Sequence, residues 1–224
     1  MKWMLPAICT VSLALSQVAT EANKAYSTKE GRAGLVQGLD NASRDARQKP
    51  RELVESLAIQ PGSTVVDLGT GPGYMLPFLS VAVAPSGKVI AEDIQRDFVD
   101  KAREKAKTAG LSNVEFVLGT DTDPKLPAGA ADLILVLDAY HHFDYPDRML
   151  KALRASLKPD GRLAIVEYHK KRGAMPGGDP DRPLTHIRLA AEDVVKEIEA
   201  NGFKLLSMRE HVPNSQYVAM FRRD

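Results

Sequence analysis

The residues best suited to bind a charged ligand form a glycine-rich run between a β-rich segment and an apolar segment. Residues 65–73 read VVDLGTGPG, which places glycines at positions 69, 71 and 73. Glycine adopts positive φ angles at little steric cost and lets a ligand approach the bare backbone. The free N–H groups at the start of a following helix attract an anionic group. The run therefore predicts a ligand-binding loop at the end of a strand.

The spacing of this loop and of nearby acids argues against a dinucleotide site. A dinucleotide loop needs glycine at position 74, where this chain has Tyr74. An acid, Asp67, instead stands two residues before the first glycine. Asp93 ends the second predicted strand, about 20 residues downstream, where an acid accepts hydrogen bonds from ribose hydroxyls. Asp121 follows the third predicted strand, so all three acids are expected at the ligand-binding edge of an open α/β sheet.

A second polar group follows the fourth predicted strand, where residues 137–143 read LDAYHHF. Histidine titrates near neutral pH and can remove a proton from a hydroxyl or an amine. His141 and His142 are therefore the candidate general bases, with helix capping or pocket shaping as the alternative roles. Asp138 is a candidate for orienting a ligand, or a cap or turn residue.

Metal binding is the remaining interpretation of these strand ends. Asp138, His141, Glu167 and His169 all follow or end predicted strands, and carboxylate and imidazole groups bind metals. No spacing among these residues is diagnostic of a metal site. We therefore predict that the protein holds no metal.

Strands and helices alternate along the chain in the pattern of a parallel, doubly wound α/β sheet. The last two predicted strands are joined by only residues 212–215, a link that permits a hairpin but no parallel crossover. A glycine- and proline-rich loop at residues 170–185 is a candidate lid, and His186 and Arg188 follow it. The predicted strands are residues 64–68, 88–92, 114–118, 131–137, 162–167, 203–210 and 216–221; the predicted helices begin near residue 43 and include 98–109, 148–157 and 191–201.

Residues 64–168 resemble the core of the class I S-adenosylmethionine-dependent methyltransferases, and the run DLGTGPG resembles the first motif of that family. The resemblance implies a Rossmann-like, doubly wound sheet of seven strands in the order 3-2-1-4-5-7-6, with strand 7 antiparallel. It implies S-adenosyl-L-methionine as cofactor and SN2 transfer of its methyl group to an acceptor. The chain looks like bacterial small-molecule methyltransferases, with ubiquinone/menaquinone methyltransferases as more distant relatives.

The resemblance also assigns parts of the methyl donor to residues of this chain. The three glycines approach the methionyl part, and Asp67 holds its ammonium group. Asp93 takes the ribose hydroxyls, with Glu92 as a rival whose side chain is expected on the opposite side of the strand. Asp121 contacts the adenine, with Asp123 as its rival. The expected donor-binding residues are Asp67, Gly69, Thr70, Gly71, Gly73, Asp93, Ile94, Thr120, Asp121 and Asp138.

Composition divides the chain into three parts. Its 224 residues, 44% hydrophobic and 26% charged, fit one globular domain with an N-terminal appendage. We interpret residues 1–19 as a hydrophobic segment, either a signal peptide or an anchor that binds a membrane through residues 3–15. Residues 20–42 are expected to form a linker or loosely ordered arm, and residues 43–224 the methyltransferase domain. The single cysteine, Cys9, excludes an intramolecular disulfide.

The sequence favours a small-molecule acceptor but leaves alternatives open. The formal net charge is +1 and the sequence contains no basic domain, which argues against a nucleic-acid partner. The sequence also contains no NPPY run after the fourth strand, which argues against a protein or RNA substrate. A protein or RNA methyltransferase and a non-catalytic S-adenosylmethionine-binding protein remain the alternatives. Because the donor is made in the cytoplasm, we favour a domain on the cytoplasmic side, with a periplasmic or secreted protein as the other location. Nothing in the sequence indicates an oligomeric state.

Overall fold

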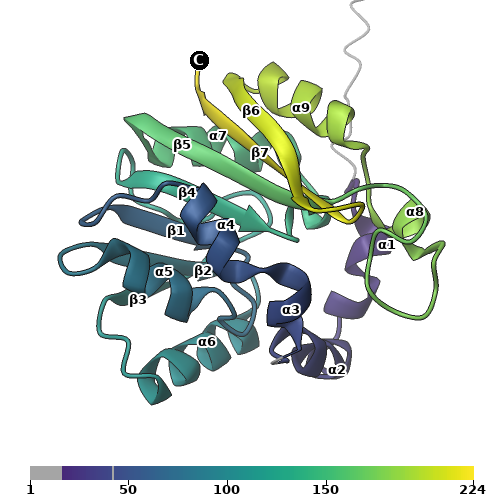
Figure 1. The fold of residues 1–224 in the computed structure, drawn as a ribbon, viewed down its shortest axis with the longest axis horizontal. Coiled ribbons are helices and arrows are strands. Elements are labelled where there is room, and N and C mark those ends of the chain that lie inside the picture. Colours follow the sequence, from purple (N-terminus) through teal and green to yellow (C-terminus); the bar gives the residue numbers. More distant parts are fainter. Residues whose placement is uncertain (1–16, 42) are drawn as a thin grey trace, which may run out of the picture.

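A seven-stranded sheet in the order β3-β2-β1-β4-β5-β7-β6 forms the centre of the protein (Figure 1). The computed structural model describes residues 17–41 and 43–224. Strands β1 to β5 run parallel, and β7 runs antiparallel to both of its neighbours, which confirms the predicted order and hairpin. The strands are β1 (Thr64–Leu68), β2 (Lys88–Asp93), β3 (Val114–Leu118), β4 (Ala131–Leu137), β5 (Leu157–Tyr168), β6 (Phe203–Val212) and β7 (Gln216–Arg223).

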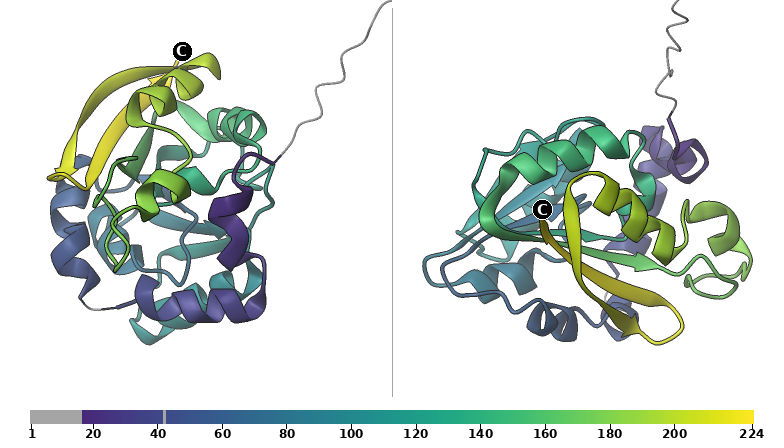
Figure 2. Two further views of the ribbon diagram at one scale, coloured as in Figure 1. Left: turned by 90° about the vertical axis from the view of Figure 1, so that its right-hand side faces the viewer. Right: turned by 90° about the horizontal axis from the view of Figure 1, so that it is seen from above.

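Helices cover both faces of the sheet (Figures 1 and 2). Successive residues of β1 point to opposite faces, so Val65 packs in one core cluster and Val66 in the other. The central strand β4 contributes to both clusters, which explains its nearly continuous apolar sequence. One face is covered by α4 (Pro50–Ser56), α5 (Leu76–Val83) and α6 (Arg96–Thr108), and the other by α7 (Pro146–Ser156) and α9 (Ala191–Ala200).

Strand β5 and the loop that follows it differ from the sequence-based prediction. Strand β5 begins at Leu157, because Leu157 pairs with Ala131 across a register shift before the regular ladder starts at Arg162. The predicted loop over residues 170–185 contains a short helix, α8 (Arg182–His186). Pro183 lies in the first turn of α8, a position where its fixed φ angle favours a helix.

The segment before β1 differs from the loosely ordered arm that the sequence predicts. It forms α1 (Thr20–Asn23), η1 (Lys24–Tyr26) and α2 (Lys29–Leu39) before α3 (Arg44–Gln48), which lies where the sequence predicts a helix. Its glycines favour a loop by propensity, but contacts with the domain override a preference of this size. The Thr28 side chain caps α2 by accepting from Gly31 N, and the Arg32 guanidinium bonds both carboxylate oxygens of Asp97 at the start of α6.

The predicted signal peptide or anchor lies almost entirely outside the described residues, as does Cys9. Membrane binding through residues 3–15 and the domain boundaries therefore stay predictions. Among residues 17–41 and 43–224, no helix has the length and apolar character needed to cross a bilayer.

Candidate functional site

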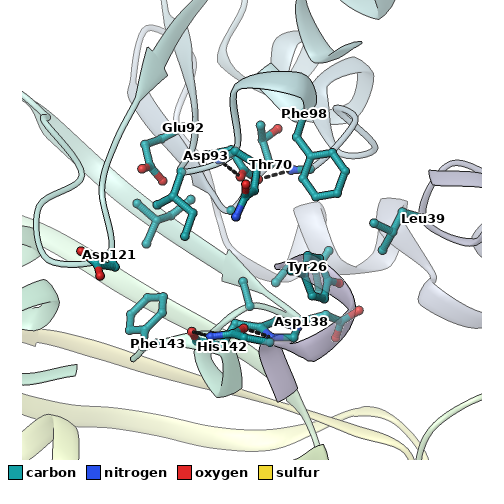
Figure 3. Close-up of a pocket in the computed structure, with 18 of the residues that line it drawn as sticks. Tyr26, Leu39, Thr70, Glu92, Asp93, Phe98, Asp121, Asp138, His142 and Phe143 are labelled. Atoms are coloured by element: carbon teal, nitrogen blue, oxygen red, sulfur yellow. Dashed lines mark hydrogen bonds between the residues drawn. The ribbon is translucent and has the colours of Figure 1, made fainter. Parts of the chain in front are cut away.

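A pocket of about 430 Å³ opens where β1, β2 and β4 end (Figure 3). This volume is in the range of small-ligand pockets, and the position is the crevice in which parallel α/β sheets bind ligands. The floor comes from the loops that follow the three strands. The N-terminal helices and the loop after η2 (Tyr140–His142) supply the remaining walls.

The glycine loop has the backbone conformation that its sequence predicts. Gly69, Gly71 and Gly73 all have positive φ angles, of 71°, 55° and 87°. Gly69 and Gly71 line the pocket, and a Cβ at Gly71 would meet nothing within 4 Å. Gly73 does not line the pocket: a Cβ there would lie 3.1 Å from the Ala102 Cα. Gly73 therefore serves the packing of the loop against α6, whereas Gly71 leaves room for a ligand.

Two buried acids hold the loop. Thr70 Oγ1 donates to Asp67 Oδ2 over 2.7 Å. Asp93 accepts from Gly71 N at 2.9 Å through Oδ2 and from Gln95 N at 2.8 Å through Oδ1. Burial raises the pKa of Asp67 and of Asp93 to about 6. Both carboxyl groups line the pocket, as the sequence predicts.

Glu92 reaches the same pocket, although strand alternation predicts it on the opposite side from Asp93. Its Oε1 is buried and has no hydrogen-bond partner among the described residues. This oxygen lies against Gly119: a Cβ added at Gly119 would be only 1.9 Å from Glu92 Oε1. Burial and the neighbouring charge of Asp93 raise the Glu92 pKa well above its ordinary value. Glu92 thus lines the pocket with one carboxyl oxygen buried against Gly119.

Only some of the predicted adenine contacts line the pocket. Ile94 is 43% exposed and lines the pocket, and so does Asp121. Thr120 does not: its hydroxyl donates to Asp123 O in a tight turn. Asp123 binds Lys125 outside the pocket, so the structure favours Asp121 over its rival.

Asp138 occupies the opposite end, directly after β4. Its φ angle of 53° is unusual for a residue other than glycine, and such conformations persist where the surroundings fix them. The Arg44 guanidinium lies 3.3 Å from Oδ2, and the Gln216 amide donates to Oδ1. Burial raises the Asp138 pKa to about 7, against the opposing effect of Arg44.

The two predicted bases occupy different positions. His142 lines the pocket, and its Nδ1 lies 2.8 Å from Asn23 Oδ1. Burial and the adjacent His141 and His186 lower the His142 pKa well below its ordinary value. His141 is only 4% exposed, does not line the pocket, and has its Nδ1 2.6 Å from Glu167 Oε2.

The four residues considered for a metal site do not all gather. His169 lies beside Glu210, with 2.8 Å between Nε2 and Oε1, away from His141. A different third histidine, His186 at the end of α8, approaches instead. Its ring centroid lies 4.9 Å from that of His141 and 5.5 Å from that of His142.

Sequence reasoning missed the N-terminal part of the pocket. Tyr26 packs edge-on against His142, with 4.5 Å between ring centroids, and lies 6.1 Å from the Phe98 ring. Arg44 stacks on Tyr74 at 4.1 Å from the ring centroid. The available signal was weak: Tyr26 is the only aromatic residue between positions 17 and 43. The other missed residues that line the pocket include Gln17, Asn23, Leu39, Phe98, Phe143 and Met149.

Comparisons with known proteins agree with this geometry. Residues 65–161 match a family model described as a methyltransferase domain. A ubiquinone/menaquinone biosynthesis C-methyltransferase of Escherichia coli is 30% identical over 121 residues, which cover 54% of this chain and 48% of that protein. An uncharacterized protein of a Streptomyces fradiae transposon is 35% identical over 122 residues, 54% of this chain and 35% of that protein. The matches thus span about half or less of these relatives.

A solved structure covers more of the fold. The crystal structure of a SAM-dependent methyltransferase from Aquifex aeolicus has a TM-score of 0.78 and 28% identity, over 85% of this chain and 98% of that one. The matched domain, the strand order and the glycine loop lead to the same conclusion: residues 65–161 carry a methyltransferase domain, and the protein has the fold of the class I S-adenosylmethionine-dependent methyltransferases.

Proposed function

We propose that the protein transfers the methyl group of S-adenosyl-L-methionine to a small-molecule acceptor. The observation that carries this proposal is a single pocket with two chemically different ends. One end has the glycine loop with Asp67 and Asp93, and the other has Asp138 and His142. A donor held at the first end would present its reactive group toward the second.

The residues of the first end suit the donor. Open space at Gly71 leaves the backbone accessible to the donor. Asp67 would hold the ammonium group and Asp93 the ribose hydroxyls. Ile94 and Asp121 would contact the adenine, and Gly69 and Thr70 the methionyl part. Gly73 and Thr120 would support the loops rather than touch the donor.

The chemistry requires alignment above all. S-adenosyl-L-methionine supplies an electrophilic methyl group on a sulfonium, and aligning an acceptor with that group provides most of the rate gain. An acceptor hydroxyl or amine must also lose a proton. Asp138 is a candidate base, because a pKa of about 7 suits proton transfer near neutral pH. His142 is the other candidate, because it lines the same pocket, whereas His141 does not.

The walls of the pocket favour a small acceptor. Residues of α1 and η1 and Leu39 at the end of α2 line the pocket, and Figure 3 shows Tyr26 and Leu39 on the side opposite Glu92 and Asp121. A folded protein or an RNA duplex would have to displace these helices to reach Asp138. A second proposal, that the chain binds the donor without transferring it, is tested by the same experiment.

The test combines binding with turnover. We would titrate the purified chain calorimetrically with S-adenosylmethionine and then S-adenosylhomocysteine, and screen phenols, quinones, thiols and amines for S-adenosylhomocysteine release. We expect binding of both ligands and turnover with one acceptor class. Gly71→Val is the matched control and should abolish both signals. A folded wild-type chain that binds neither ligand would refute the proposal, and binding without turnover across the screen would favour the non-catalytic alternative.

A further inference from the structure

We propose that His141, His142 and His186 form a binding site for one divalent transition-metal ion such as Zn²⁺. The site departs from the sequence-based prediction that the protein holds no metal. One ring nitrogen from each histidine lies within 4.8 Å of the other two. Imidazole nitrogen is a preferred ligand of zinc and its neighbours in the first transition series.

The fold brings these rings together from two segments that are distant in sequence. His141 and His142 lie in η2, directly after β4, and their ring centroids are 4.0 Å apart. His186 ends α8, in the connection that follows β5. Because β4 and β5 are adjacent parallel strands, both segments leave the sheet at the same edge. In Figures 1 and 2, α8 lies beside α1, which in turn packs against η2.

Hydrogen bonds behind two of the rings orient them as metal ligands. The Nδ1 atom of His141 faces the buried carboxylate of Glu167 at 2.6 Å. The Nδ1 atom of His142 faces Asn23 Oδ1 at 2.8 Å. The orientation of this amide is fixed, because its Nδ2 donates to His142 O and to Asp144 Oδ2, both at 3.0 Å. An acceptor behind Nδ1 keeps the proton there and leaves Nε2 with a lone pair for a metal.

The remaining nitrogens lack protein partners in the part of the chain that the structure describes. Within residues 17–41 and 43–224, no hydrogen bond engages Nε2 of His141 or His142, or either ring nitrogen of His186. Three clustered imidazoles, two of them oriented through Nδ1 and each with a nitrogen free of hydrogen bonds in the described residues, match the arrangement of a three-histidine metal site. Such a site leaves a further coordination position for water or a ligand.

The position of the site gives the metal a role at the acceptor end of the pocket. His142 belongs to both the cluster and the pocket wall, next to Tyr26. An acceptor hydroxyl or thiol bound at the open coordination position would become more acidic. This role rests on the proposed methyl transfer, whereas the metal site itself does not.

Metal binding to the full chain tests the site directly. After removal of metals with a chelator, we would titrate the protein with Zn²⁺ by calorimetry and with Co²⁺ by visible absorption, which reports the ligand geometry. We expect one ion per chain. His186→Ala and His142→Ala should abolish the absorption band and weaken Zn²⁺ binding at least tenfold. His169→Ala, His211→Ala and Cys9→Ser are the matched controls and should bind as the wild type does.

Two further variants separate coordination from folding and from donor binding. Asn23→Ala removes the acceptor behind His142, together with the amide's bonds to His142 O and Asp144, and should weaken Zn²⁺ binding by about 10- to 100-fold. His186→Ala should still bind S-adenosylhomocysteine, because His186 does not line the donor pocket. A wild-type chain that binds no Zn²⁺, or a folded His186→Ala chain that binds it unchanged, would overturn the metal site. Failure of donor binding alone would refute the methyl-transfer proposal and leave the metal site standing.

Discussion

Replacing Asp93 by alanine should weaken donor binding without unfolding the protein. The Asp93 carboxylate accepts two backbone N–H groups, one from the glycine loop and one from the start of α6. It also faces the pocket, where we expect the ribose hydroxyls. The variant loses both the contact with the ligand and the tie that holds Gly71 in place.

The size of the effect follows from the charge on the acceptor. A hydrogen bond to a charged group contributes about 1.5–3 kcal/mol. Since about 1.4 kcal/mol corresponds to a tenfold change in affinity, donor binding should weaken by about 10- to 150-fold near pH 7.5. With a pKa of about 6, the wild-type carboxyl is largely protonated at pH 5. The factor by which the wild type binds the donor more tightly than the variant should therefore be about tenfold smaller at pH 5 than at pH 7.5.

The assay is calorimetric titration with S-adenosylhomocysteine at pH 7.5 and pH 5, with thermal unfolding as the check on folding. Asp100→Ala is the matched control, because Asp100 is an exposed acid on α6 whose ion pair with Arg103 lies in solvent. That variant should bind as the wild type does at both pH values. Equal affinities of Asp93→Ala and the wild type at pH 7.5, or a ratio that stays constant with pH, would refute the assignment of Asp93.

Three other predictions concern the loop, the N-terminal cover and the buried acids. Gly71→Val should abolish donor binding and lower the stability by about 1–2 kcal/mol, because valine disfavours the positive φ angle of this position. Gly73→Val should lower the melting temperature further, because its side chain would collide with Ala102. Similar melting temperatures of the two variants would contradict the assignment of Gly71 to ligand access and Gly73 to packing. Tyr26→Ala should weaken donor or acceptor binding by about 2- to 10-fold through loss of aromatic contacts, and Tyr26→Phe, the control, should not. The Asp67 pKa of about 6 lies above its ordinary value of 3.8, so the folded protein binds this proton more tightly than the unfolded chain does. The stability that this proton contributes is complete below about pH 4 and is lost as the pH rises through 6. Relative to Asp67→Asn, the donor-free wild type should lose about 1.4 kcal/mol between pH 5 and 7.5, measured by urea unfolding, and a constant difference would contradict the burial of this acid.

The sequence predicts best what local chemistry determines. Val65 to Gly73 specify a buried strand and a glycine turn by residue type alone, and the short link after Val212 dictates a hairpin, so the donor end of the pocket and the antiparallel last pair follow from the chain. The order of the seven strands follows from the family resemblance instead. The N-terminal helices do not, because Gly31, Gly34 and Gly38 signal a loop, while contacts such as that of Arg32 with Asp97 depend on the finished fold. The approach of His186 to His141 is also tertiary, since no spacing in the sequence links them. The donor-site assignments themselves remain predictions that the geometry supports.

The division of the pocket wall between two parts of the chain has a consequence for how specificity changes among relatives. The residues of the donor end lie within the matched segment 65–161, whereas Asn23, Tyr26, Leu39 and Arg44 lie before it. Proteins that share only the matched segment therefore share the donor end and the positions of Asp138 and His142, but not the N-terminal wall of the pocket. A change in the N-terminal helices would alter the shape of the acceptor end while the donor end stays unchanged. Chimeras that exchange residues 17–63 between relatives would then exchange acceptors, not cofactors.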